Sequence, residues 1–143
     1  MQDKRPRVNF PVAKDMGERI WGKEKLLVHA EKKYTMKKLF IKRGQKGGLQ
    51  YHRLKDEAAF VLSGQILLRF EAEDGSLEQR EFGPGDFFHF PPGSVHQEEA
   101  LSDVVLIEVS TPHFNDRVRV EKEFGLDPGD GLPTTTLDEI LSG

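Results

Sequence analysis

The stretch "GGLQYHRLKDEAAFVLSG" (residues 47–64) joins possible metal ligands to a strand pattern that ends at a glycine. In an extended strand, side chains at positions i and i+2 share a face, so Gln50 and His52 should point to the same side. After the turn "RLKD", Glu57 opens a second run of apolar residues. A surface strand has no need of this combination, whereas a metal site does. We therefore interpret the stretch as two strands that carry metal ligands.

Strand-like runs continue on both sides of this stretch. They lie at 25–30, 34–41, 65–73, 76–82, 86–90, 95–100 and 104–110. Turn sequences such as "EDGS", "GPGD" and "PPGS" separate several of them, because Gly supplies positive φ and Pro fixes φ. No helical pattern lies between the runs. Short strands at this spacing predict an all-β fold, an antiparallel sandwich or barrel.

The length of 143 residues predicts one domain with a core of its own. We expect residues 1–20 to form an N-terminal arm and residues 21–112 to form the barrel. Residues 113–143 are expected to be an extension that packs on the barrel or on a dimer partner. Within it, "TTTLDEILSG" (134–143) has a Thr N-cap, acidic residues in its first turn and apolar residues at helical spacing, which predict a short C-terminal helix.

A second informative stretch is "GDFFHFPPGSVHQEEA" (residues 85–100). Its "PPGS" turn leads into a strand that begins at Val95 and His96. A hairpin that enters in this way can return His96 to the side of Gln50 and His52. The two stretches together would then meet inside the barrel.

These two stretches resemble the two motifs of cupins. "QYHRLKDEAAFVLSG" (50–64) is similar to the first motif, with Gln50 where a histidine is common. "GDFFHFPPGSVH" (85–96) is similar to the second, although Ala100 replaces its usual final asparagine. The resemblance implies a cupin-type antiparallel β-barrel, also called a jelly roll or double-stranded β-helix, with a metal site inside.

A wider resemblance covers residues 19–125. The segments "RIWG" (19–22), "YTMKKLFIKRG" (34–44) and "LIEVSTPHFNDRVRVEKEFG" (106–125) are similar to the cupin domain of type II phosphomannose isomerases. That family uses a Q-x-H…E…H set of metal ligands. Carried over residue by residue, the set falls on Gln50, His52, Glu57 and His96.

The chain departs from that family beside the ligands. Leu54 stands where the family has a second histidine, and Ala59 stands where it has a tryptophan. We therefore expect an altered and enlarged pocket, and survival of the family's phosphate-binding site is open. Lys55 keeps the positive charge of the family's arginine, two positions before the glutamate.

The residue types in the ligand set also fit metal chemistry by themselves. Two imidazoles, one carboxylate and one amide oxygen suit a divalent ion such as Zn²⁺, Mn²⁺, Fe²⁺ or Ni²⁺, of which we favour Zn²⁺. With one Glu the site keeps a positive charge and favours an anionic ligand. Two open positions on such an ion could chelate an α-hydroxy carbonyl and stabilise the enediolate formed by proton removal.

Two further residues are candidates for catalysis. Glu98 lies two positions beyond His96 and shares its face, so it can serve as a general base; a plain inner-wall or rim carboxylate is the alternative. Lys55, with Arg53, flanks the ligand turn and can hold a phosphate or carboxylate. For Arg53 a solvated rim charge is the simpler interpretation. His89 is expected in the core or at the rim, not as a ligand.

Composition sets the broad class. The chain has no cysteine, which excludes disulfides and thiolate metal sites. No apolar run approaches the ~20 residues that span a bilayer, and "MQDKRPRVNFPVAK" lacks the apolar stretch of a secretory signal, so we expect a cytoplasmic protein without a membrane partner.

Charge is distributed unevenly along the chain. Residues 1–55 carry 16 Lys and Arg against 5 Asp and Glu, and residues 56–143 carry 5 Lys and Arg against 19 Asp and Glu. No aromatic-basic recognition motif accompanies this asymmetry, so no nucleic-acid partner is expected.

The leading hypothesis is a metal-dependent enzyme that isomerises a sugar or sugar phosphate through a metal-stabilised enediolate. Other cupin chemistry stays open, namely oxygenation at Fe²⁺ or cyclisation of a polyketide-type substrate, because a fold does not decide a reaction. A non-catalytic module that binds a small molecule is a further alternative. Small cupins that resemble this chain are commonly homodimers, so a homodimer is expected.

Overall fold

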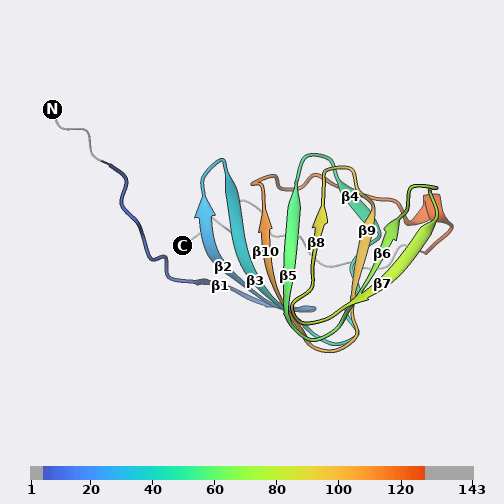
Figure 1. Cartoon of the computed structure of the whole chain (residues 1–143), viewed down its shortest axis with the longest axis horizontal. Helices are drawn as coiled ribbons and strands as arrows, with labels where there is room; N and C mark the ends of the chain where they lie inside the picture. Colours follow the sequence, from blue (N-terminus) through green and yellow to red (C-terminus); the bar gives the residue numbers. More distant parts are fainter. Residues whose placement is uncertain (1–4, 128–143) are drawn as a thin grey trace.

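Two antiparallel sheets face each other in the computed structural model, which describes residues 5–127 (Figure 1). The six-stranded sheet has the order β1-β2-β3-β10-β5-β8, and the five-stranded sheet has the order β11-β4-β9-β6-β7. The strands are β1 (Lys14–Arg19), β2 (Gly22–Ala30), β3 (Tyr34–Ile41), β4 (Gln50–His52), β5 (Glu57–Ser63), β6 (Ile66–Glu71), β7 (Leu77–Phe82), β8 (Phe87–Phe90), β9 (His96–Ala100), β10 (Val104–Ser110) and β11 (Arg117–Arg119), followed by a 3-10 helix, η1 (Glu121–Phe124). This is the all-β antiparallel fold that the strand pattern predicted, and it has the form of the jelly roll that the cupin resemblance implied.

Alternation along the central strand β10 explains how the sheets face each other. Val104, Leu106 and Ser110 are buried, whereas the residues between them are more exposed. Leu106 pairs with Leu39 of β3 on one side and with Val61 of β5 on the other. Since side chains alternate between the two faces of a strand, one row of each strand points into the space between the sheets.

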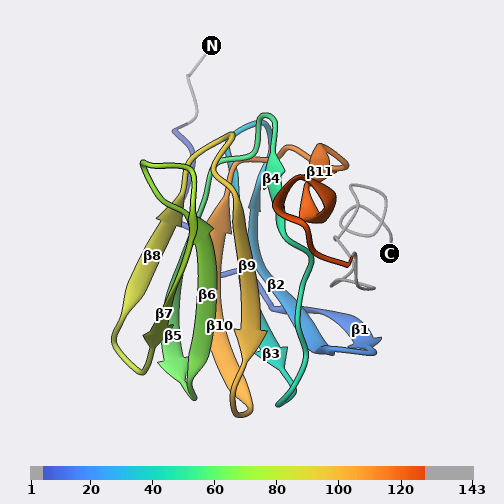
Figure 2. The same ribbon diagram turned by 90° about the vertical axis from the view of Figure 1, so that its right-hand side faces the viewer.

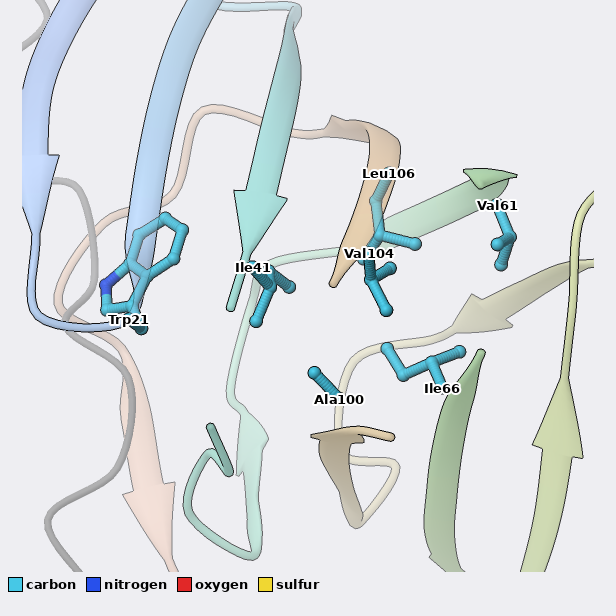
Figure 3. Close-up of a cluster of buried hydrophobic side chains, with 7 residues drawn as sticks. All are labelled: Trp21, Ile41, Val61, Ile66, Ala100, Val104 and Leu106. Carbon is cyan, nitrogen blue, oxygen red and sulfur yellow. The ribbon is translucent and has the colours of Figure 1, made fainter. Parts of the chain in front are cut away.

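The apolar core fills one end of that space. It consists of Trp21, Ile41, Val61, Ile66, Ala100, Val104 and Leu106, all at most 4% exposed (Figure 3). A smaller apolar cluster of Leu49, Val95 and Val120 lies under η1 and β11. Further along the same inward rows the residues become polar, since Glu57 lies four positions before Val61 and Glu108 two positions after Leu106. The polar end of the barrel interior is where the candidate site lies.

Both sheets extend beyond residues 21–112. β1 pairs with β2 at one edge of the six-stranded sheet, and β11 pairs with β4 at one edge of the five-stranded sheet (Figure 2). The helix predicted over 134–143 lies outside the described residues. Among the residues that the structure describes, no helix is long and apolar enough to cross a membrane.

Candidate metal centre

Three strands bring the four predicted ligands to one cavity. Gln50 and His52 lie on the same face of β4, and Gln50 pairs directly with His96, the first residue of β9. Glu57 is the first residue of β5, on the opposite sheet. All four side chains are buried and line the same cavity. The pairing of β4 with β9 therefore brings His96 beside Gln50, as the two sequence stretches predicted.

Both histidines aim the same ring atom at one carboxylate oxygen. His52 Nε2 lies 3.6 Å from Glu57 Oε1, and His96 Nε2 lies 3.4 Å from the same oxygen. One ligand atom from each of these three residues lies within 4.8 Å of the other two. Metal bonds of about 2.0–2.2 Å from nitrogen and oxygen place neighbouring ligands at such separations. His52, Glu57 and His96 thus form a group that could hold one divalent ion.

The other nitrogen of each imidazole is held by an acceptor. His52 Nδ1 donates a hydrogen bond to Asp116 Oδ1 over 2.9 Å, and His96 Nδ1 donates to the carbonyl oxygen of Ser94 over 3.0 Å. The proton on Nδ1 leaves the lone pair on Nε2, toward Glu57. Acceptors of this kind fix the tautomer and orientation of metal-binding histidines. The Phe90 ring also stacks on His96, with centroids 3.7 Å apart.

Gln50 supplies an independent test of whether a cation fits here. Its Oε1 atom is buried and has no hydrogen-bond partner among the described residues. A buried amide oxygen without a partner is rare in folded proteins, because it loses its bonds to water and gains nothing in return. An ion between Gln50 and His96 would give this oxygen a partner. The residues present therefore fit the divalent ion that the sequence predicted.

Electrostatics favours the protonation states that a metal needs. Burial lowers the pKa of His52 below its usual value despite the nearby carboxylates of Glu57 and Asp116, so its imidazole stays neutral. Burial alone would raise the pKa of Glu57, but the neighbouring His96 and the charge of Lys55 outweigh it and lower this pKa. A neutral imidazole and an ionised carboxylate are the ligand forms that bind a cation.

The family model for the cupin domain matches residues 39–110, half of the chain, and spans every one of these ligands. The chain belongs to the cupin family. Among curated proteins, this cupin is 34% identical over 61 residues to a probable oxalate decarboxylase of Arthroderma benhamiae, covering 41% of the chain and 15% of that protein. It is 32% identical over 68 residues to germin-like protein subfamily T member 3 of Arabidopsis thaliana, covering 40% of the chain and 30% of that protein. The cupin thus spans only a small part of the length of these relatives.

Solved structures agree on the fold. KdgF from Halomonas sp. superposes with a TM-score of 0.57 at 25% identity, covering 66% of the cupin and 81% of that chain. Bacillus subtilis oxalate decarboxylase, a protein with Mn(II) centres, superposes with a TM-score of 0.65 at 19% identity, covering 87% and 39%. The capsular polysaccharide assembling protein CapF from Staphylococcus aureus gives a TM-score of 0.64 at 18% identity, covering 76% and 34%. None of these comparisons is specific for phosphomannose isomerases.

The cavity of the cupin is small and highly charged. Its volume is about 90 Å³, room for roughly three water molecules. Besides the ligands it is lined by charged side chains from both sheets and from β11: Glu24, Lys37, Lys55, Glu98, Glu108 and Arg117. Lys37 Nζ pairs with Glu24 Oε1 over 2.9 Å, deep in the barrel.

Glu98 and Lys55 both lie in this cavity, as expected from the sequence. Burial, followed by the charges of Glu57 and Glu108, raises the pKa of Glu98 to about 8. The Lys55 amine lies 3.6 Å from Glu57 Oε2. Burial alone would lower the pKa of Lys55, but Glu108, Glu57 and Asp116 outweigh it and raise this pKa, so the amine stays charged.

The two departures from the family pattern, Leu54 and Ala59, do not line the cavity. Leu54 is 61% exposed and points away from the cavity, and Ala59 is buried without lining it. Leu54 lies in the turn between β4 and β5, where the strand alternation that positions Gln50 and His52 no longer holds. Arg53 is exposed, and His89 is exposed on β8, where its Nε2 atom lies 2.7 Å from Asp56 Oδ1.

Five residues of the site were not found from the sequence, and one of them is Glu24 on β2. Alternation along β3 and β10 would have placed Lys37 and Glu108 on the inward rows, next to buried neighbours of the same parity. Asp116 and Arg117 belong to a segment that pairs with β4 only at the edge of the sheet. No pattern within either segment predicts that β11 pairs with β4.

Proposed function

We propose that this cupin is a divalent-metal-dependent isomerase, which moves a proton between adjacent carbons of a small anionic hydroxy-carbonyl compound such as a sugar or sugar phosphate. One observation carries the proposal most. Glu98 lies in the same cavity as the four candidate ligands Gln50, His52, Glu57 and His96. Its carboxyl group forms no ion pair with any of the residues that the structure describes. Proton transfer next to a carbonyl requires a bound metal ion and, close to it, a group that can accept the proton.

His52, Glu57 and His96 would hold the ion, and Gln50 would add its amide oxygen. When bound, the divalent ion supplies Lewis acidity, which polarises the oxygen atoms of the substrate. The barrel keeps the ligands rigid, because the hydrogen bonds of Asp116 and Ser94 fix both imidazoles.

Glu98 would take the proton from one carbon and return it to the next. Its position on β9, two residues beyond His96 and on the same face, points it at the space in front of the ligands. A group that both accepts and donates the proton needs no second base.

Charge and volume support an anionic substrate with a small reacting end. Three cationic side chains and four carboxyl groups line the cavity, so a divalent ion makes its balance positive. Lys55 and Arg117 would face the anionic group. The cavity volume of about 90 Å³ suits the small hydroxy-carbonyl end of such a compound.

Decarboxylation of a small dicarboxylate is the second candidate. It is supported by the 34% identity over 61 residues to the probable oxalate decarboxylase and by the volume of the cavity. The same cations would bind the second carboxylate of such a substrate.

The test is metal analysis of the purified protein, followed by turnover assays in D₂O. The panel contains mannose 6-phosphate, fructose 6-phosphate, other aldose and ketose phosphates, short hydroxy-carbonyls and oxalate. Isomerisation with deuterium incorporated beside the carbonyl supports the proposal, and release of CO₂ from oxalate supports the second candidate. A protein that retains its metal but turns over nothing in the panel is a binding module instead.

Glu98→Gln is the decisive variant, with Glu99→Gln as its matched control. Glu99 is the neighbour on the other face of β9, where it pairs with Arg69 over 2.9 Å and does not line the cavity. We expect Glu98→Gln to lose about 100-fold or more in kcat while metal content is unchanged. Glu99→Gln should retain full turnover.

A further inference from the structure

Arg117 reaches the cavity from a strand that lies next to the ligands. It is the first residue of β11, and in the antiparallel pairing of β11 with β4 it stands directly opposite His52 (Figure 2). Neighbouring strands lie about 4.8 Å apart, and side chains that stand opposite each other point to the same face of the sheet. Both His52 and Arg117 line the cavity. The guanidinium group is therefore a neighbour of the candidate metal ligands.

The guanidinium group of Arg117 can bind an anion inside the cavity. Burial lowers the pKa of Arg117, and the nearby charge of Glu57 opposes this decrease. A guanidinium group nonetheless stays protonated in proteins, and its five N–H donors form a planar fork. Such a fork holds both oxygens of a carboxylate by two parallel hydrogen bonds, while the other donors keep their contacts within the protein.

We propose that Arg117 binds a carboxylate that is bonded directly to the hydroxy-carbonyl group, so that the substrate is a sugar acid or keto acid rather than a sugar phosphate. The inference rests on the proposed function, because it names the anionic group of that substrate. Since Arg117 stands opposite His52, the anionic group that it binds must lie close to the reacting carbons, in front of the same ligands. A carboxylate can be bonded to those carbons. The phosphate of a sugar phosphate lies at the far end of the carbon chain.

The charges that line the cavity also favour an anionic group with a single negative charge. Lys37 pairs with Glu24 over 2.9 Å, and the Lys55 amine lies 3.6 Å from the ligand carboxylate. Glu98 and Glu108 add two further carboxyl groups to the lining. At neutral pH a phosphate ester carries about 1.5 to 2 negative charges, whereas a carboxylate carries one. Repulsion by the carboxyl groups therefore disfavours a phosphate more than a carboxylate.

The shortest compound of this class has three carbons and is hydroxypyruvate, HOCH₂–CO–COO⁻. In its isomerisation Glu98 would take a proton from the CH₂ carbon and return it to the carbon beside the carboxylate, while one proton moves from the hydroxyl oxygen to the carbonyl oxygen. The product is tartronate semialdehyde, OHC–CHOH–COO⁻, which has the same atoms and the same charge. The carboxylate takes no part in these transfers and can stay bound to Arg117.

The experiment is titration calorimetry of the Zn²⁺-loaded protein with three probes that share one hydroxy-ketone end, namely hydroxypyruvate, dihydroxyacetone and dihydroxyacetone phosphate. We expect hydroxypyruvate to bind about tenfold or more tightly than either of the others. Arg117→Gln should weaken hydroxypyruvate binding about 10- to 100-fold, because it removes a charge-assisted pair of hydrogen bonds, and should leave dihydroxyacetone binding unchanged. Arg117→Lys keeps the charge but not the fork, so its affinity for hydroxypyruvate should be intermediate.

Two controls separate this contact from folding and from charge at the rim. Arg53→Gln removes an exposed cation from the turn between β4 and β5, which does not line the cavity, and should bind hydroxypyruvate like the unchanged chain. Zn²⁺ affinity should not fall in Arg117→Gln, because the guanidinium group is not a ligand and its positive charge opposes a cation.

Three results would overturn the assignment: dihydroxyacetone phosphate binds most tightly, none of the three probes binds, or Arg117→Gln binds hydroxypyruvate as tightly as the unchanged chain. Binding that depends on Arg117, without deuterium incorporation into hydroxypyruvate in D₂O, would support the assignment and contradict the proposed isomerase. Isomerisation of a sugar phosphate by a protein whose binding of hydroxypyruvate does not depend on Arg117 would do the reverse.

Discussion

His52 Nδ1 lies 2.9 Å from Oδ1 of Asp116, a residue 64 positions further along the chain. The other oxygen of the same carboxylate accepts the backbone N–H groups of Leu54 and Lys55, over 2.9 and 2.8 Å. Asp116 therefore orients a ligand and holds the turn that joins the two ligand-bearing strands. Both functions come from a loop outside the stretch that carries the ligands.

Replacing Asp116 should weaken metal binding without removing a ligand. Asp116→Ala leaves the His52 ring free to turn and is expected to raise the dissociation constant of the metal about 10- to 100-fold. Asp116→Asn keeps an acceptor for Nδ1 and should lose less. Titration calorimetry with Zn²⁺ or Mn²⁺ measures both. A lower melting temperature with unchanged metal affinity would mean that Asp116 only supports the turn.

Gln50→Ala tests whether the amide oxygen belongs to the ligand set. The substitution removes the buried Oε1 that lacks a partner among the described residues, so we expect metal affinity to fall about tenfold or more. Gln50→Glu keeps an oxygen at this position and adds a negative charge, which should restore or strengthen binding. Competition with a chelator of known affinity gives the ranking. Equal affinity of Gln50→Ala and the unchanged chain would remove Gln50 from the set.

Glu98 makes the stability of the metal-free protein depend on pH. Its pKa is raised from 4.5 to about 8 in the folded state, so its contribution is fully favourable below 4.5 and is lost as pH rises toward 8. Glu98→Gln cannot lose a proton. We expect its free energy of unfolding, relative to the unchanged chain, to rise from near zero at pH 4 to a few kcal/mol above pH 8.

Urea unfolding at a series of pH values, with a chelator present, measures this difference. Glu99→Gln again serves as the control, since Glu99 is partly exposed on the other face and pairs with Arg69. A difference between Glu98→Gln and the unchanged chain that does not vary between pH 4 and pH 8 would contradict the assignment.

Local patterns sufficed for much of the fold and for part of the candidate site, whose ligand set the family resemblance implied. The strands predicted over 34–41 and 104–110 have those bounds in the structure, because their apolar and β-branched residues mark them. The i, i+2 spacing of Gln50 and His52 placed them on one face of β4. These inferences need only a few neighbouring residues.

The remainder depends on contacts between distant parts of the chain. β1 (Lys14–Arg19) carries few apolar residues, and β11 (Arg117–Arg119) has three residues in all, so neither shows a strand pattern. Asp116 reaches His52 only because β11 pairs with β4. Packing decides the register between strands that lie far apart in the sequence. The sequence of one strand therefore cannot predict its register with the other.

Gly64→Ala should destabilise the barrel more than the same change at Gly75. Gly64 lies in the turn that leads from β5 in one sheet to β6 in the other, and Gly75 lies in the β6–β7 hairpin. Both have a similar positive φ, 87° and 83°, so an added Cβ costs about 1–2 kcal/mol of backbone strain at each. At Gly64 that Cβ would also lie 2.1 Å from the carbonyl oxygen of Asp103, whereas at Gly75 it would meet nothing within 4 Å. Because the collision is with backbone, the turn between β5 and β6 must move away from β10. Urea unfolding should show an additional loss of about 2 kcal/mol or more for Gly64→Ala, and equal losses at the two positions would show that the turn yields without cost.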